Sequence, residues 1–176
     1  MDLYKFHSNP ETLHGHDRAD EIVPERIYNI ARFGKKLTNK QEDTLAKNPE
    51  YAYYYALNVL KKPFPKGEDA ISKDPYFAYS YAYNVLKKPW PKGEDAIAKN
   101  PYYAYYYACN ILKKPWPKGE DVIAKDTEYA YYYARTVLKN PFYKGEDAIS
   151  KDSYWAFKYA INVLELPEAE AKQWHK

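Results

Sequence analysis

The sequence predicts an all-α fold, an α-solenoid of five 26-residue helix–turn–helix repeats with a cap at each end. Alanines in the tracts between the repeated motifs, such as Ala104 and Ala108, have helical rather than alternating spacing. Capping residues and prolines bracket each tract at the positions where helices begin and end. The strongest observation is the period itself. The motif KGED, and KQED once, recurs every 26 residues, beginning at Lys40, Lys66, Lys92, Lys118 and Lys144.

Each repeat is predicted to contain a long helix. An Asn or Asp side chain can accept hydrogen bonds from the free N–H groups of a first helical turn, and a proline suits the position that follows it. About 13 residues later, lysines and then a proline end the helical pattern. The predicted N-caps are Asn48, Asp74, Asn100, Asp126 and Asp152.

The KGED segment is predicted to form a short helix before each long one. Its acidic residues come first and a lysine comes last, as in residues 92–99, which matches the helix dipole at both ends. An aromatic residue flanked by prolines, such as Trp90 between Pro89 and Pro91, joins one repeat to the next.

The ends of the chain depart from the period. We expect one structural domain with an N-terminal cap (1–39), the five-repeat solenoid (40–169) and a C-terminal cap (170–176). Residues 24–36 are similar to a long helix, ended by Gly34, and the tail from Pro167 is similar to a short helix.

Composition excludes several classes of protein. The chain has 176 residues, 45% of them hydrophobic and 29% charged, so it is predicted to be neither disordered nor membrane-spanning. The net charge of +3 is too small to indicate nucleic-acid binding by itself. Cys109 is the single cysteine, which excludes an intrachain disulfide. No secretory signal is recognised at the start, and we expect a cytoplasmic protein.

Comparison of the five copies predicts which side of the long helix is buried. Ala52, Tyr55 and Ala56 are invariant among the copies, which indicates core positions. Positions equivalent to 50, 54, 57 and 61 fall on the opposite arc of a helical wheel, so we expect them to face solvent. An asparagine near the helix end, as at Asn110, is expected to bond the loop that follows, with a ligand role as the other interpretation.

The predicted binding residues lie on the solvent arc of the middle repeats. Tyrosine and arginine are frequent anchors of protein interfaces, while lysines can attract or neutralise an anionic partner. A structural role of the lysines at the helix ends, as dipole caps, is an equal alternative. The candidates are Tyr76, Tyr83, Tyr102, Tyr106 and Tyr132, supported by Lys87, Lys113, Arg135 and Lys139.

No catalytic site is predicted, and no cofactor is implied. The repeats lack histidine, and the four histidines are His7, His14, His16 and His175. The segment LHGHDRAD could supply three metal ligands from His14, His16 and Asp17, but a surface loop is the simpler interpretation, and no metal site is assigned. We therefore expect a protein that is not an enzyme.

The segment AIAKNPYYAYYYACNILKKPWPKGED resembles a family of short α-helical repeats found in bacteriophage and large-virus proteins. The resemblance covers about three-quarters of the chain. It implies a viral origin and the host cell cytosol as location, and it carries over no catalytic residue.

Three functions are consistent with these observations. The first is a solenoid that docks on a host protein, such as a defence component, and blocks it. The second is capture of an anionic nucleotide or single-stranded nucleic acid by tyrosine stacking and lysine neutralisation. The third is a structural scaffold. Salt discriminates the first two, because phosphate contacts weaken steeply with salt. The partner and the oligomeric state stay open.

Overall fold

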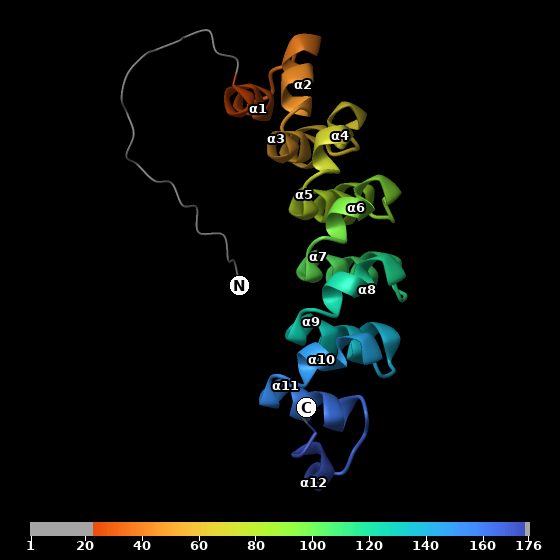
Figure 1. The fold of residues 1–176 in the computed structure, drawn as a ribbon. Helices are drawn as coiled ribbons and strands as arrows, with labels where there is room; N and C mark the ends of the chain where they lie inside the picture. The colour runs from red at the N-terminus through yellow and green to blue at the C-terminus, as the bar shows by residue number, and fades with distance from the viewer. Residues whose placement is uncertain (1–22, 175–176) are drawn as a thin grey trace, which may run out of the picture.

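The structure is a computed structural model that describes residues 23–174, and these residues form helices and turns without a strand. The helices stack along one axis, from α1 and α2 at one end to α12 at the other (Figure 1). The predicted all-α repeat solenoid is therefore confirmed.

Each repeat contributes a short helix and then a long helical segment. Neighbouring long segments contact one another, and each of the first four also packs against the short helix that follows it. The short helices are α2 (Asn39–Ala46), α4 (Glu68–Ile71), α6 (Glu94–Ile97), α8 (Pro117–Ile123) and α10 (Glu146–Ile149). The long segments begin with α3 (Pro49–Tyr54), α5 (Pro75–Ser80), α7 (Pro101–Tyr106), α9 (Thr127–Tyr132) and α11 (Ser153–Asn162).

The predicted N-caps are confirmed in all five repeats. In α7, the Asn100 side chain accepts a hydrogen bond from the Tyr103 backbone N–H at 3.2 Å. In α11, Asp152 Oδ1 accepts two, from the N–H groups of Tyr154 (2.9 Å) and Trp155 (3.1 Å). Proline follows the cap in the first three repeats, where no N–H is needed.

The first four long segments do not stay α-helical to their ends. Each continues into a π-helix of six residues, as at Tyr107–Leu112 after α7. A π-helix closes i→i+5 hydrogen bonds, so its residues advance by a smaller angle than those of an α-helix. The α-helical wheel therefore does not describe the geometry of the second half of the segment, although residues that it predicts to face solvent there, such as Tyr83, Arg135 and Lys113, are exposed.

The terminal segments complete the stack. The predicted N-terminal helix is α1 (Pro24–Arg32), which ends before Gly34 at φ 86°, a conformation that suits glycine. The C-terminal tail forms α12 (Glu168–Ala171), and the Trp174 ring lies 5.1 Å from that of Tyr159. Both predictions of degenerate helices are confirmed.

A buried tyrosine holds each repeat together and ties it to the previous one. Tyr107 is fully buried, and its hydroxyl donates to Glu94 Oε1 of its own repeat (3.0 Å) and accepts from the Trp90 N–H of the preceding linker (2.8 Å). The KGED glutamate is thus a hydrogen-bond acceptor as well as a helix-dipole residue. Tyr81, Tyr133 and Tyr159 make the equivalent pair of bonds, and Tyr55 makes the bond to glutamate.

Small residues allow this close packing. Ala104 and Ala108 are completely buried, as the sequence predicts. A Cβ atom added at Gly119 would lie 2.4 Å from the Trp116 ring and 3.3 Å from Ala104 Cβ, so this glycine lets the short helix approach the previous long one.

An asparagine near the end of the long segment, such as Asn84 or Asn110, links neighbouring repeats. Asn84 Nδ2 donates to the Tyr53 hydroxyl at 2.9 Å, and Asn110 Nδ2 donates to the Tyr79 hydroxyl at 3.2 Å. The predicted bond to the following loop is wrong, because a tyrosine hydroxyl of the preceding long segment is the acceptor. The same contact recurs as Asn58 with Tyr28, Thr136 with Tyr105, and Asn162 with Tyr131.

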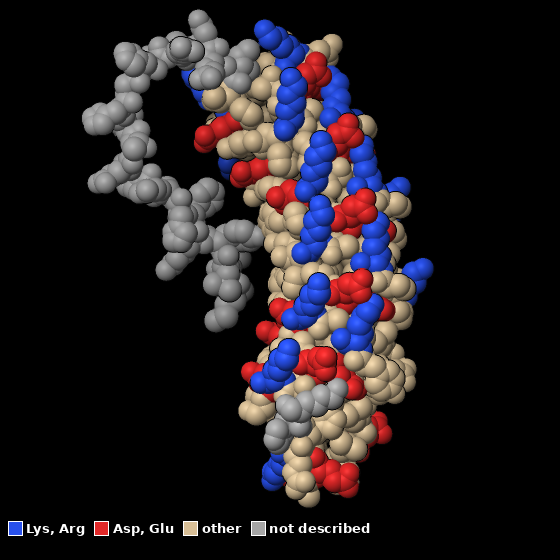
Figure 2. All heavy atoms as spheres, viewed as in Figure 1, with Lys and Arg blue, Asp and Glu red and all other residues tan. Residues whose placement is uncertain are grey.

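Exposed ion pairs form a further ladder. The lysine of one KGED motif reaches the aspartate of the motif before it, as in Lys92–Asp69 (2.6 Å) and Lys118–Asp95 (2.8 Å). The lysine lowers the pKa of each of these aspartates. Figure 2 shows basic side chains in rows along the stack with acidic side chains between them. Exposed pairs of this kind contribute little to stability.

We expect Tyr107→Phe to lower the free energy of unfolding by about 1–3 kcal/mol, because the ring stays while the buried Trp90 N–H loses its partner. Urea unfolding followed by circular dichroism measures the change. The control is Tyr102→Phe, whose exposed hydroxyl makes no comparable bond, and which we expect to change stability by less than about 0.5 kcal/mol. Equal losses in the two variants would contradict the structural role of the Tyr107 hydroxyl.

Alkaline pH should unfold the solenoid. Burial raises the pKa of Tyr81, Tyr107, Tyr133 and Tyr159 above the ordinary value of 10.0. Because the unfolded chain ionises first, the stability from these groups is complete below pH 10 and falls as pH rises toward their folded-state pKa values. We expect loss of helical dichroism above about pH 10, accompanied by a cooperative rise in phenolate absorbance. Gradual ionisation near pH 10 with helices intact would contradict this.

Candidate functional site

The predicted binding residues separate into two surfaces. Tyr83 and Tyr102 are 48% and 43% exposed, and Arg135 is exposed as well. Tyr76, Tyr106 and Tyr132 are only partly exposed. The predicted lysines are exposed but lie beyond the helix, at its C-terminal end, and they belong to a separate edge of the molecule: Lys87, Lys113 and Lys139.

The position shared by Tyr106 and Ser80 is not a solvent position. Ser80 is 5% exposed, which contradicts the predicted arc. The reason is that this position faces the next repeat. The Tyr106 ring centroid lies 6.5 Å from that of Tyr129, and the Tyr132 centroid lies 5.5 Å from that of Trp155.

Ring contacts run through the whole stack. Starting at Tyr28 in the N-terminal helix, each ring lies against one in the same or the next repeat, and the contacts continue to Trp155 in the fifth repeat. Burial, together with the nearby Glu128 carboxylate, raises the pKa of Tyr129 in this array to about 12. Sequence reasoning identified the tyrosines but missed that most of them support one another.

Tyr83, Tyr102 and Tyr154 are exposed tyrosines in contact with this array. Together with the exposed Arg135 they form a surface that we call the tyrosine face. Tyr83 stacks on Tyr79, with centroids 5.8 Å apart and planes 13° apart. Tyr102 lies 4.6 Å from Tyr106. Arg135 donates to the Tyr131 hydroxyl at 3.0 Å. These contacts hold the exposed side chains in defined positions.

A second surface, the lysine edge, consists of the lysines that follow the long segments: Lys61, Lys62, Lys87, Lys88, Lys113, Lys114 and Lys139. Lys113 has φ 54°, and its counterparts in the first, second and fourth repeats have φ of 53–54°. This left-handed conformation is strained for a residue with a Cβ, and glycine is the usual residue there. Nothing in the sequence predicts this conformation, because lysine is not a residue that marks it.

A hollow of about 340 Å³ lies in the lysine edge between the third and fourth repeats. Cys109, Lys113 and Lys114 line it from the third repeat, and Thr136 and Lys139 from the fourth. No aromatic side chain lines this hollow. The structure thus brings two of the predicted lysines together, but away from the aromatic rings.

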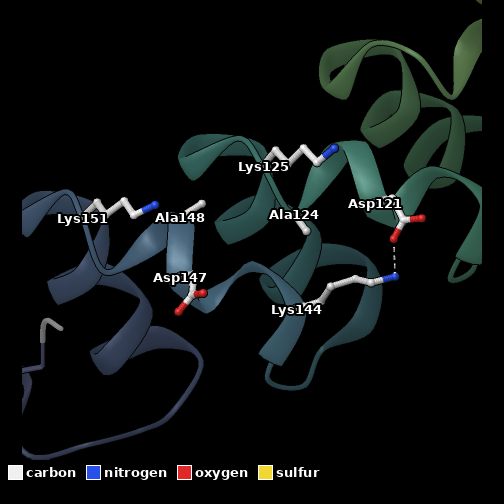
Figure 3. Close-up of a pocket in the computed structure, with 7 residues that line it drawn as sticks. All are labelled: Asp121, Ala124, Lys125, Lys144, Asp147, Ala148 and Lys151. Atoms are coloured by element: carbon white, nitrogen blue, oxygen red, sulfur yellow. Dashed lines mark ion pairs between the residues drawn. The ribbon is translucent and has the colours of Figure 1, made fainter.

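A larger hollow, of about 540 Å³, lies between the short helices α8 and α10 (Figure 3). Asp121 is paired with Lys144, and the side chains of Lys125 and Lys151 do not converge on a common point. Ala124 and Ala148 supply the rest of its wall. This hollow is a gap between the ion pairs of adjacent repeats rather than a binding site.

The predicted metal alternative cannot be placed. His7, His14, His16, Asp17 and His175 lie outside the described residues. Between residues 23 and 174, no group of three or more potential ligands is arranged to hold a metal ion. In the same range, no helix has the length and apolar character needed to cross a membrane.

Comparison with known proteins gives no relative, since no protein-family model, curated protein or solved structure matches the chain. Functional conclusions therefore come from the two exposed surfaces.

The left-handed lysines make a specific stability prediction. We expect Lys113→Gly to raise the free energy of unfolding by up to about 1 kcal/mol, because glycine adopts this conformation without the Cβ clash. Thermal unfolding followed by circular dichroism measures this change in stability. Lys114→Gly is the matched control, since Lys114 has a negative φ, and it should be neutral or destabilising. A loss of stability in Lys113→Gly would show that the lysine itself holds the turn.

Proposed function

We propose that the chain is a non-enzymatic binding protein whose tyrosine face docks on a protein partner. The observation that carries this proposal is the pair of exposed rings, Tyr83 and Tyr102, each fixed by contact with another ring. Aromatic side chains and arginine are the most frequent energetic anchors of protein interfaces. An exposed ring that is held in place by a neighbouring ring is well suited to be such an anchor.

Preorganisation supports the same proposal. Binding loses free energy when flexible side chains become fixed, about 0.5–1.5 kcal/mol for each. The ring contacts beneath the tyrosine face and the hydrogen bond from Arg135 to Tyr131 remove part of that loss before the partner arrives. Because the support comes from adjacent repeats, the face is continuous along the stack.

The proposed partner is a host-cell protein that this chain covers and blocks. This part of the proposal comes from the resemblance of the repeats to those of bacteriophage and large-virus proteins, together with the expected location in the host cytosol. A blocking protein needs a surface and no reaction centre, which agrees with a binding face built from repeated residues.

Capture of a nucleotide between rings and lysines is less well supported. It requires an aromatic ring and an amine to converge on one ligand. The hollow that holds Lys113 and Lys139 is lined by no ring, and the exposed rings are fixed against other tyrosines. A purely structural scaffold has no need for anchors held in place on one face.

The test is affinity capture from host lysate, divided into nuclease-treated and untreated halves, followed by measurement of the affinity of each captured protein. We expect Tyr83→Ser combined with Tyr102→Ser to weaken binding by at least about 2 kcal/mol, roughly 30-fold, in both halves. Tyr143→Ser is the control, because Tyr143 is 78% exposed but lies in a linker off the tyrosine face. Equal binding by the double variant and the wild type would refute the proposed face.

A further inference from the structure

We infer that the lysine edge binds the phosphodiester backbone of single-stranded nucleic acid, without stacking of bases. This inference rests on other residues than the proposed protein partner does, although the two surfaces adjoin, since Cys109 in the lysine hollow stands at the repeat position of Tyr83. It follows from the unpaired charge of these lysines among the described residues, from their left-handed backbone conformation and from their regular spacing.

The lysine edge carries positive charge that no acidic side chain of the described residues pairs with. None of its lysines forms an ion pair within residues 23–174. The KGED lysines differ, since Lys66, Lys92, Lys118 and Lys144 are each paired with an aspartate of the preceding motif. Lysines that look alike in the sequence therefore have different surroundings. A third set, such as Lys99 at the end of a short helix, forms no ion pair in the same range but, in addition to Lys118, lies close enough to a KGED aspartate to lower its pKa.

The conformation of these lysines argues against a purely structural role. The fifth repeat has Glu165 at the equivalent position, with φ 56°, so the turn forms without a positive charge. A lysine near a helix C-terminus does interact favourably with the helix dipole. That benefit is similar in size to the strain of a left-handed residue with a Cβ, which glycine would avoid. The left-handed turn recurs in all five repeats with either Lys or Glu, so the strain belongs to the turn, while the lysine at four of the five positions adds an exposed charge that the turn does not require.

The spacing of the charges fits a regular polymer. Packed helices lie about 8–10 Å apart, and most repeats carry two lysines on the edge, which gives roughly one positive charge per 4–5 Å along the stack. A nucleic-acid backbone is the matching partner, because it carries one negative charge per nucleotide at a constant interval. The acidic residues on the surface of a folded protein without repeats have no such period.

The surroundings of the edge between the third and fourth repeats favour backbone contact over base recognition. The hollow there offers Lys113, Lys114 and Lys139 but no ring on which a base could stack, because Cys109 stands at the repeat position of Tyr83. Lysine is a flexible point charge and suits phosphate contact without fixed geometry. A single strand can follow an edge of any curvature, whereas a duplex is stiff over about 150 base pairs. The expected ligand is therefore single-stranded and bound without regard to sequence.

The experiment measures binding of a fluorescent 20-nucleotide oligothymidylate to the full chain by anisotropy over a range of salt concentrations. For the wild type we expect log K to fall with log salt with a slope of about −3 to −5, at roughly 0.7 per phosphate contacted. The edge variant, in which Lys87, Lys88, Lys113 and Lys114 are changed to Gln, should bind at least 10-fold more weakly, with a slope reduced by about 2–3.

The control variant changes Lys73, Lys99, Lys125 and Lys151 to Gln. Both variants lose four charges and take the formal net charge from +3 to −1, so they differ only in where the charge is removed. The control should bind within about threefold of the wild type, and so should Tyr83→Ser combined with Tyr102→Ser. Oligoadenylate should bind as tightly as oligothymidylate.

Several results would overturn the inference. Absence of wild-type binding at about 50 mM salt would refute the inference directly. Equal weakening by the edge and control variants would mean that the attraction is non-specific. Tighter binding of a duplex of equal length would refute the single-stranded ligand. Equal competition by a 20-residue polyglutamate would assign the edge to an acidic protein segment. Loss of oligonucleotide binding in the tyrosine variant would show that the two surfaces are one site.

Discussion

The stack depends on one tyrosine hydroxyl per repeat. It sits in the dry interior, accepts from the backbone of the preceding linker and donates to the glutamate of its own short helix, as Tyr107 does with Trp90 and Glu94. A buried hydroxyl without partners is costly, so these bonds permit only one relative position of linker, short helix and long segment. The alanines and the KGED glycine then bring the helices close enough for the bonds to form.

Much of this architecture could be predicted from the sequence. The period, the caps such as Asn100, the buried Ala104 and Ala108 and the terminal helices all follow from local rules on spacing and capping. The predicted solvent-facing arc of the long helix is wrong at positions that these local rules do not describe. Ser80 is buried because it faces another repeat, and the residues after Tyr107 are π-helical, which no propensity scale distinguishes from α. The asparagine bonds were missed because their tyrosine partners lie about 30 residues away in the chain.

The candidate sites were harder to predict for a related reason. Charge and aromaticity identify which side chains can bind a partner. They do not show whether a side chain is already engaged in a contact with another residue of the same chain. Tyr76 and Tyr106 belong to the ring array, while Tyr83 and Tyr102 remain accessible. Lys92 is held by Asp69, while Lys87, five residues earlier, has no ion pair among the described residues. Only the three-dimensional structure separates these cases, because the deciding partner always comes from a neighbouring repeat.

The repetition of the same bonds between neighbours also determines how the molecule responds to force. The junctions consist of the same tyrosine, asparagine and lysine contacts, with Thr136 in place of the asparagine once, and none of these contacts reaches beyond the adjacent repeat. Tension applied at the two ends would therefore be borne by junctions of similar strength, and the chain would lengthen in steps as single repeats detach. Each step frees 26 residues, which span about 90 Å when extended. The repeat period therefore sets the length by which the chain extends in each step.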